Sequence, residues 1–252
     1  MRAVVLSAGQ GKRLLPLTAT EPKCLLPVDG HSTVLGLQLE ALARCGFDLT
    51  TVVTGFGADH VERFICGRRF GDMRVETLFN PFFSVSDNLA TCWMARGAMQ
   101  GDFVLLNGDT LFEDALLQRV IAAPPAPIIV TIDRKDEYDA DDMKVKLDPE
   151  GRLGAIGKTL PPHTVDGEAI GMILFRNSGT SAYRDALDRA IRQPESMRNW
   201  YLSVVDEMAQ KMPVETICIE GCWWAEIDSR EDLDGVRGHF LPGTVQRTVP
   251  ET

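Results

Sequence analysis

Segments typical of strands alternate with segments typical of helices along the first half of the chain, and this order constrains the fold most. Residues 2–7, with Val4 and Val5, predict a first strand, and a stripe of leucines over residues 33–45 predicts the helix after it. Because strands joined through helices lie parallel, we expect an α/β protein with a mixed, mainly parallel sheet flanked by helices. Further strands are expected at residues 49–54, 74–79, 103–106 and 128–132, and further helices at residues 59–64, 87–99 and 111–122.

The pattern changes in the second half of the chain. Strand-like segments at residues 143–147, 152–156 and 169–175 are separated by turn residues, which predicts a small β-rich lobe. Helices at residues 178–192, 200–211 and 230–240 and a strand at 214–219 complete the expected elements. We expect one domain over residues 1–240 with an inserted substrate lobe at approximately 133–212, followed by a C-terminal tail at 241–252.

The charge balance limits the class of partner. The chain carries 26 basic and 36 acidic side chains, a net charge of −10. Nucleic acid as a partner calls for a basic face, so this balance argues against it. An acidic protein that binds a polyanion must gather positive charge locally, and Lys12, Arg13 and Lys23 near the N-terminus fit this requirement.

The chain also lacks the features of a membrane or secreted protein. No apolar run approaches the roughly 18–20 residues of a membrane span, and the N-terminus lacks the regions of a signal peptide. The six cysteines include no C-x-x-C pair and the four histidines form no cluster, so structural zinc is not expected. We expect a cytoplasmic protein with reduced cysteines and no membrane insertion. The sequence leaves open whether the protein forms a homo-oligomer.

The stretch V-V-L-S-A-G-Q-G-K-R-L-L-P-L-T-A-T-E-P-K, from Val4 to Lys23, has the composition of a phosphate-binding loop. It fits neither the Walker motif nor the dinucleotide fingerprint. Gly9 and Gly11 allow close approach of the backbone to a ligand, and Lys12, Arg13 and Lys23 can donate to anionic oxygens. The alternative is a solvated basic turn, which the lysine inside E-P-K-C-L-L-P-V makes less favoured.

Two further segments offer carboxylates. In L-L-N-G-D-T-L-F, a buried strand is expected to place Asp109 at the carboxyl edge of the sheet. A carboxylate there suits Mg²⁺, which prefers one or two carboxylates together with substrate phosphates. In W-W-A-E-I-D-S-R-E-D-L, Glu226 and Asp228 alternate with apolar residues and share one face of a short strand. The alternatives are a turn aspartate for the first segment and a helix capped by Ser229 with Asp232 for the second.

Together these segments resemble the sugar-phosphate nucleotidyltransferase superfamily, whose α/β fold is GT-A-like and Rossmann-like. The superfamily signature, roughly A-A-G-x-G-x-R-L-x-P-L-T followed by P-K, appears here as S-A-G-Q-G-K-R-L-L-P-L-T from Ser7, followed by Pro22-Lys23. The resemblance continues through N-G-D at 107–109 and E-I-D at 226–228, and Ser7 is its one departure in the loop.

The resemblance implies a Mg²⁺-dependent nucleotidyltransferase and gives roles to individual residues. Arg13 would contact the leaving pyrophosphate, Lys23 would bridge the reacting phosphates, and Lys158 would meet the incoming phosphate. Asp109 and Asp228 would hold Mg²⁺. The other nucleotide-binding residues would be Leu6, Ala8, Gly9, Gly11, Lys12, Gly108 and, near the base and ribose, Asn80 and Asn88.

Within the superfamily, D-N-L-A-T-C-W-M-A-R, G-E-A-I-G-M-I-L-F and N-W-Y-L-S-V-V-D-E-M resemble the phosphocholine cytidylyltransferase branch. That branch transfers CMP from CTP to phosphocholine or a similar phosphorylated alcohol, and releases pyrophosphate with a CDP-alcohol. Asp87-Asn88 replaces the asparagine pair of the branch. The alternative is a nucleotidyltransferase for a sugar-1-phosphate, an inositol phosphate or a phosphonate that uses UTP, dTTP, GTP or CTP.

Choline would be held by aromatic faces and carboxylates, at about 0.5–2 kcal/mol for each cation–π contact. The expected acceptor-binding residues are Lys144, Glu168, Trp200, Tyr201, Trp224 and Glu226. Core packing competes with this interpretation for Trp223 and Trp224, and a solvated loop competes with it for the acidic residues 134–142. A regulatory nucleotide-binding protein without catalysis is a second class of function, and the intact lysine, arginine and aspartates of the motifs count against it.

Overall fold

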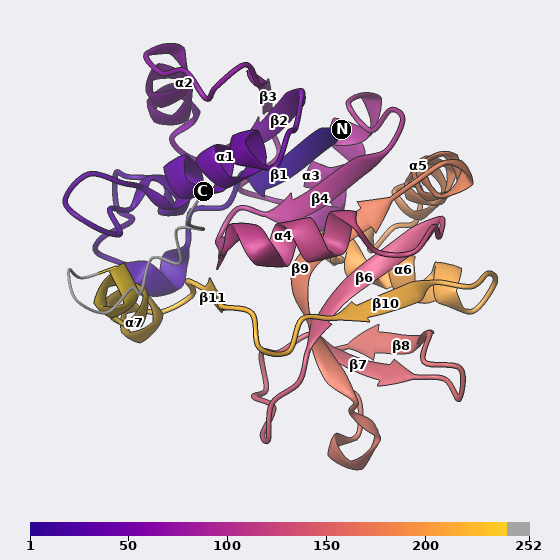
Figure 1. Ribbon diagram of the computed structural model, residues 1–252. Helices are drawn as coiled ribbons and strands as arrows, with labels where there is room; N and C mark the ends of the chain where they lie inside the picture. Colours follow the sequence, from indigo (N-terminus) through magenta and orange to yellow (C-terminus); the bar gives the residue numbers. More distant parts are fainter. Residues whose placement is uncertain (241–252) are drawn as a thin grey trace, which may run out of the picture.

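The alternating first half of the chain builds four neighbouring parallel strands. The computed structural model describes residues 1–240, and its main sheet has nine strands (Figure 1). β1 (Arg2–Ser7) lies between β2 (Leu49–Thr54) and β4 (Phe103–Asn107), and β3 (Arg74–Phe79) pairs with β2 at the edge. All three pairings are parallel, so the carboxyl ends of these strands meet at one edge of the sheet.

The second half extends the same sheet with antiparallel pairs. β9 (Gly167–Phe175) runs antiparallel between β4 and β6 (Ile128–Asp133), and β10 (Glu215–Cys218) lies parallel to β6. Four of the six pairings along this path are parallel, so the prediction of a mixed, mainly parallel sheet is confirmed.

A hairpin forms the small β-rich part of the molecule. β7 (Lys144–Leu147) pairs with β8 (Leu153–Gly157) and with the first residues of β9, where Lys144 lies opposite Glu168. It projects from the end of β9, at the bottom of Figure 1. The predicted division into one domain with an inserted lobe stays a prediction, and the predicted tail at 241–252 lies outside the described residues.

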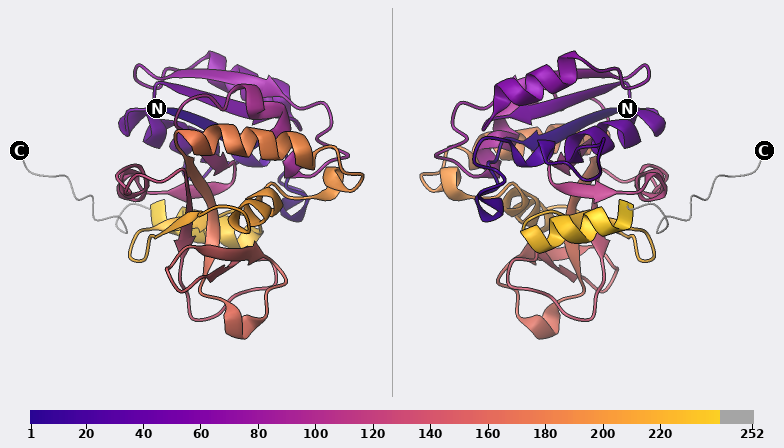
Figure 2. Two further views of the ribbon diagram at one scale, coloured as in Figure 1. Left: turned by 90° about the vertical axis from the view of Figure 1, so that its right-hand side faces the viewer. Right: turned by 90° about the vertical axis from the view of Figure 1, so that its left-hand side faces the viewer.

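Helices cover both faces of the sheet. Neighbouring residues of a strand point to opposite faces, so each face carries apolar side chains that must be buried. In β1, Ala3 and Val5 pack into one apolar cluster and Val4 packs into another. Figure 2 shows both sides, with α5 across one and α7 in front on the other. One face carries α1 (Val34–Arg44), α2 (Ala58–Cys66) and α4 (Asp114–Ile121), and the other carries α3 (Asn88–Met94), α5 (Ser178–Ala190) and α6 (Leu202–Ala209). α7 (Arg230–Phe240) packs into a third cluster.

The prediction of a helix over residues 111–122 was wrong at its start. Thr110–Phe112 forms the short strand β5, which pairs antiparallel with β11 (Trp224–Glu226), and α4 begins only at Asp114. The partner strand, distant in sequence, decides the conformation of these three residues, so local pattern could not reveal it. This pairing brings the Asp109 and Asp228 segments together.

The other expected elements differ from the observed ones only at their ends. The helix expected at 87–99 is α3 followed by a 3₁₀ turn at Ala95–Gly97, and the helix expected at 200–211 covers Leu202–Ala209. Among residues 1–240, no helix combines the length and the apolar character that a membrane crossing requires.

Candidate active site

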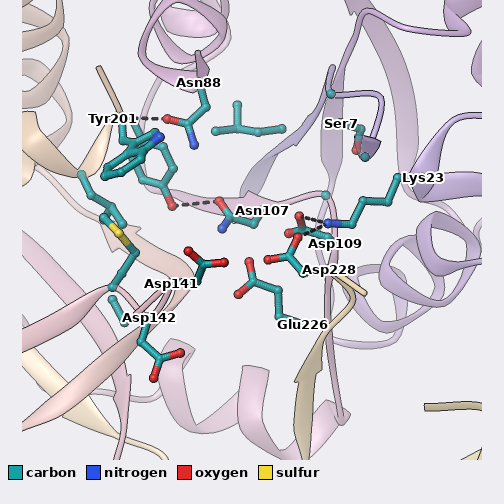
Figure 3. A pocket seen from close by; sticks show the side chains of 18 of the residues that line it. Ser7, Lys23, Asn88, Asn107, Asp109, Asp141, Asp142, Tyr201, Glu226 and Asp228 are labelled. Atoms are coloured by element: carbon teal, nitrogen blue, oxygen red, sulfur yellow. Dashed lines mark hydrogen bonds and ion pairs between the residues drawn. The ribbon is translucent and has the colours of Figure 1, made fainter. Parts of the chain in front are cut away.

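A pocket of about 280 Å³ opens at the carboxyl ends of β1 and β4, between the parallel half of the sheet and the β7–β8 hairpin (Figure 3). In an α/β sheet, ligands bind at this edge. The lining residues are Leu6, Ser7, Gly9, Gly11, Arg13, Lys23, Cys24, Asn88, Asn107, Gly108, Asp109, Asp141, Asp142, Met143, Lys158, Glu168, Ala169, Trp200, Tyr201, Leu202, Glu226 and Asp228.

The glycine loop folds around the side chain of Lys23. Gly11 has φ +73°, and a Cβ at this position would lie 2.9 Å from Cδ of Lys23. The hydroxyl of Thr18 donates to the carbonyl of Gly11 at 2.8 Å and closes the loop. Glycine is therefore required twice at position 11, for its backbone angle and for the passage of the lysine.

Lys23 joins the two sequence segments that carry the aspartates. Its buried Nζ donates to Oδ2 of Asp109 at 2.7 Å and to Oδ1 of Asp228 at 2.6 Å. Burial alone would lower the pKa of Lys23, but the two carboxylates outweigh it and raise the pKa above its usual value. The ammonium is therefore charged in this setting and holds the two aspartates together.

The segment of Asp228 is fixed from both sides. The amide of Ile227 donates to the carbonyl of Asp109 at 3.1 Å, next to the β5–β11 pairing. Oδ2 of Asp232 accepts from the amides of Asp228 and Ser229, and Ser229 Oγ accepts from the Asp232 amide, so the predicted cap of the last helix forms. Burial would raise the pKa of Asp228, but Lys23 and then Arg13 keep it below its usual value.

Three carboxylates gather around Lys23, as Figure 3 shows. Burial first, and then the charges of Asp109 and Asp228, raise the pKa of Glu226 to about 8. Oδ1 of Asp109 is buried and has no hydrogen-bond partner among the described residues. The raised pKa of Glu226 reflects the negative field of the two aspartates, and this field and the free carboxylate oxygen both favour a cation.

The carboxylates by themselves do not make a complete metal cage. Within residues 1–240, no group of three or more His, Cys, Asp or Glu side chains is arranged to hold a metal ion. The ammonium of Lys23 lies between the two aspartates. Two carboxylates completed by substrate phosphates, as Mg²⁺ prefers, are the donor set that this arrangement fits.

Arg13 reaches across the mouth of the pocket. Its guanidinium lies 2.7 Å from Oδ2 of Asp228 and 2.6 Å from Oδ2 of Asp141, which belongs to the loop before β7. The side chains of Arg13 and Asp141 are more than half exposed. The two walls of the pocket are thus joined by an ion pair that solvent and anions can reach.

Aromatic and amide side chains form the wall opposite Lys23. Nζ of Lys158 lies 4.5 Å from the ring centre of Trp200 and 3.8 Å from Asp141. Tyr201 is buried: its amide donates to Oδ1 of Asn88 at 2.9 Å and its hydroxyl donates to Oδ1 of Asn107 at 3.0 Å. Trp200 therefore offers the ring that a ligand can reach, and Tyr201 is held in the wall.

A second acidic group lies at the base of the hairpin. Nζ of Lys135 contacts Asp142 at 2.7 Å and Glu168 at 3.0 Å. Burial, aided by the charge of Asp142 and opposed by Lys135, raises the pKa of Glu168 to about 7. The wall that Glu168 and Asp142 form is thus only partly neutralised by lysine.

Most of the predicted site residues line this pocket, and Ala8 lines an adjoining hollow together with Leu6, Gly9 and Asn88. Four lie elsewhere. Asn80 is fully buried and its amide donates to Thr91, and the indole of Trp224 donates to Asp133 at 2.7 Å. Lys144 Nζ donates to the backbone carbonyls of Asp139 and Lys158, and Lys12 is exposed outside the pocket.

Sequence reasoning missed two polar residues of this region. Asn107 belongs to the N-G-D segment but is not among the predicted site residues, although its side chain lines the pocket and accepts from the hydroxyl of Tyr201. Gln38 was hidden in the leucine stripe of α1, where a single buried amide among leucines was the available signal.

Comparison with known proteins agrees with this geometry. A family model described as nucleotidyl transferase matches residues 2–142. The chain belongs to this family. The matched range contains the glycine loop, Lys23 and Asp109, so the prediction of a sugar-phosphate nucleotidyltransferase superfamily member is confirmed.

Two curated relatives show how far the likeness extends. The chain is 37% identical to CMP-5'-(3-aminopropyl)phosphonate synthase of Streptomyces rubellomurinus over 51% of this chain and 20% of that protein. It is 24% identical to the bifunctional IPC transferase and DIPP synthase of Aquifex aeolicus over 97% of this chain and 53% of that protein. The chain thus spans a fifth and about half of the lengths of these relatives.

A solved structure shares the fold. CTP:phosphocholine cytidylyltransferase from Streptococcus pneumoniae superimposes with a TM-score of 0.74 at 18% identity, over 94% of this chain and 97% of that one. At this identity the likeness concerns the fold, and it confirms the predicted fold class.

Proposed function

We propose that the protein transfers CMP from CTP to a small phosphorylated acceptor that carries a positive charge, with phosphocholine as the first acceptor to test. The products are a CDP-alcohol and pyrophosphate. The observation that carries this proposal is the pair of bonds from Lys23 to Asp109 and Asp228, beside Arg13, in one pocket. This arrangement gathers two cations for phosphates and two carboxylates for a metal.

The reaction is an in-line displacement. A phosphate oxygen of the acceptor forms a bond to the α-phosphorus of CTP, the bond from that phosphorus to the bridging oxygen breaks, and pyrophosphate leaves with the electron pair. A phosphate dianion is already nucleophilic, so no side-chain base is needed. Lys23 and Arg13 neutralise charge on the nucleotide phosphates, and Lys158, on the opposite wall, orients the acceptor phosphate.

Asp109 and Asp228 would hold Mg²⁺. The free, buried oxygen of Asp109 and the raised pKa of Glu226 fit a cation at this place. When bound, the metal ion neutralises charge on the phosphates and helps to align them. The carboxylates keep Lys23 in place between the same two segments.

The choice of CTP is supported by the names of two of the proteins compared, which contain CMP and CTP. The choice of a cationic acceptor is supported by the pocket wall. Asp141, Asp142 and Glu168 surround its hairpin side, and Trp200 offers an exposed ring near them. Carboxylates and an aromatic face together are the surroundings that an ammonium group prefers.

A pyrophosphate-release assay over a panel of nucleotides and acceptors tests the proposal. Each of CTP, UTP, dTTP and GTP is combined with phosphocholine, 3-aminopropylphosphonate, inositol-1-phosphate and glucose-1-phosphate. We expect turnover with CTP and the cationic acceptors, and much weaker turnover with the neutral ones. An aminophosphonate is included because of the similar Streptomyces protein.

Two outcomes would contradict parts of the proposal separately. Turnover of glucose-1-phosphate without turnover of any cationic acceptor would overturn the acceptor class and leave nucleotidyl transfer intact. Turnover with dTTP or UTP in preference to CTP would overturn the nucleotide. Product identity is checked by mass spectrometry, so that hydrolysis of the nucleotide is not mistaken for transfer.

A further inference from the structure

Gln38 is a buried amide in an apolar helix face. It lies on α1 among Leu35, Leu39 and Leu42, which belong to one core cluster, and only 1% of its surface is exposed. A leucine would bury more apolar surface at this place than an amide does. Buried amides persist where their hydrogen bonds are needed, so the partners of Gln38 indicate its purpose.

Both partners are carbonyls of the turn that carries Asp109. Nε2 of Gln38 donates to the carbonyl of Asn107 at 2.8 Å and to the carbonyl of Thr110 at 2.7 Å. These residues flank Gly108 and Asp109 in the sequence. The Oε1 atom of Gln38 has no hydrogen-bond partner among the described residues, so all the bonding of this side chain goes to the turn.

Other elements hold the same turn from other sides. The amide of Gly108 donates to the carbonyl of Leu6 at 3.0 Å, and the amide of Ile227 donates to the carbonyl of Asp109 at 3.1 Å. A Cβ on Gly108 would lie 2.4 Å from Oγ of Ser7, so the turn is pressed against β1. Gln38 adds the contact from the helical layer, and it clamps the turn on both sides of Asp109.

We propose that Gln38 is a positioning residue that sets the orientation of the Asp109 carboxylate for the divalent cation. The inference rests on the proposed metal role of Asp109. Mg²⁺ demands near-ideal octahedral geometry, so a small rotation of one carboxylate weakens its binding and misplaces the phosphates. A displacement of about 1 Å costs roughly 100-fold in rate in such sites.

The test replaces Gln38 by Met, which has a similar length and volume and no donor. Binding of Mn²⁺ is measured by isothermal titration without acceptor, both in the absence of nucleotide and with CTP present against a CTP blank, because substrate phosphates complete the donor set. We expect the Kd for Mn²⁺ and the Mg²⁺ concentration for half-maximal rate both to rise about 5-fold or more, and kcat to fall about 10-fold. The KM for the nucleotide is expected to stay within about 2-fold, because Gln38 does not line the pocket.

Thr180→Val is the matched control. Thr180 is also buried, and its hydroxyl donates to a backbone carbonyl, that of Gly101, at 2.8 Å. Gly101 lies just before β4, at the opposite end of that strand from Asp109. The control thus loses a buried hydrogen bond and some stability, and we expect its metal affinity and kcat to equal those of the wild type.

Gln38→Glu keeps the shape of the side chain and serves if Gln38→Met does not fold. An ionised carboxylate cannot donate to two carbonyls, whereas the protonated form can donate to one. Burial raises the pKa of such a group, so the deficit in Mn²⁺ affinity relative to the wild type should be smaller at pH 6 than at pH 8. Gln38→Asn, too short to span both carbonyls, should also lose affinity.

The outcomes separate this inference from the proposed function. If the wild type binds Mn²⁺ and needs a divalent cation, but the Gln38 variants match Thr180→Val in both, the positioning role is overturned and the reaction stands. If the wild type neither binds Mn²⁺ nor needs a divalent cation, the metal role of Asp109 falls, and this inference falls with it.

Discussion

Two cations of the pocket, Lys23 and Arg13, both pair with Asp228, but in contrasting surroundings. Lys23 is buried and its second partner, Asp109, belongs to the central sheet. Arg13 is more than half exposed and its second partner, Asp141, belongs to a loop of the opposite wall. The buried pair joins two distant segments of the chain, and we propose that the exposed pair exchanges Asp141 for a substrate phosphate. The same kind of contact is thus shielded from solvent in one place and open to competing anions in the other.

The aspartates of the buried pair give the sharpest test. Asp109→Ala and Asp228→Ala are each expected to lower kcat by about 100–1000-fold at saturating Mg²⁺, because each removes charge stabilisation at the reacting phosphates. Circular dichroism should show that both variants fold. Unchanged activity in both variants would remove the metal assignment.

Stability should separate the two cations. Lys23→Met leaves Asp109 and Asp228 beside Glu226 without their ammonium, and we expect a loss of about 3 kcal/mol in the free energy of unfolding. Arg13→Met breaks exposed contacts and should cost less than about 1 kcal/mol. Urea denaturation at pH 7 without divalent cations measures both. Equal losses would show that burial does not distinguish the two pairs.

The pocket wall that carries Trp200, where we propose that the acceptor binds, should respond more weakly than the buried contacts of Lys23. Trp200→Ala removes the exposed ring beside Lys158, and we expect the KM for phosphocholine to rise by about 2–30-fold with little change in the KM for CTP. Trp224→Phe is the comparison variant, because Trp224 bonds to Asp133 and does not line the pocket. A larger effect from Trp224→Phe than from Trp200→Ala would reverse the assignment of these rings.

The contrast between the two halves of the site also explains what sequence can predict. The first strand was predicted to the residue because the short apolar run Ala3–Leu6, with the β-branched Val4 and Val5, is followed by a glycine-containing loop. The glycine loop was recognisable because its motif residues Gly11 and Lys23 pack against each other, so that neither can be replaced freely. These features are local, so the glycine-loop side of the pocket could be predicted from the sequence.

The residues whose surroundings the sequence pattern does not show have partners distant in sequence. Leu111 follows a helical pattern but lies in a strand because residues 224–226 pair with it. Asn80 and Trp224 carry polar groups that suit a ligand, yet Thr91 and Asp133 use them within the fold. Pattern alone does not show which partner a polar side chain finds, because tertiary contacts decide it.

Glu168, on the hairpin side of the pocket, makes the free energy of unfolding depend on pH. Its pKa is about 7 in the folded protein against an ordinary value of 4.5, so the folded state keeps a proton that the unfolded chain loses. This stabilising contribution is complete below about pH 4.5 and is lost as the pH rises through about 7.

Glu168→Gln should remove this dependence, because its amide does not titrate. Lys135, Asp142 and Glu226 face the same region, so the difference between wild type and variant is the quantity to follow. Urea denaturation between pH 4.5 and 8 should show the wild type losing more stability than the variant as the pH rises. Parallel curves would show that Glu168 titrates normally.

The smallest expected effect tests the exposed pair itself. In the resting pocket, Asp141 occupies the guanidinium of Arg13 that a pyrophosphate group would use, so Asp141→Asn should tighten binding of inorganic pyrophosphate. Exposed ion pairs contribute about 0.2–1 kcal/mol, which corresponds to a decrease of about 1.5–5-fold in Kd. Asp136→Asn, in the same loop but outside the pocket, is the control.

In an Arg13→Met background the gain in pyrophosphate affinity should vanish, because the competition acts through Arg13. A gain of the same size without Arg13 would instead reflect the general loss of one negative charge near the ligand.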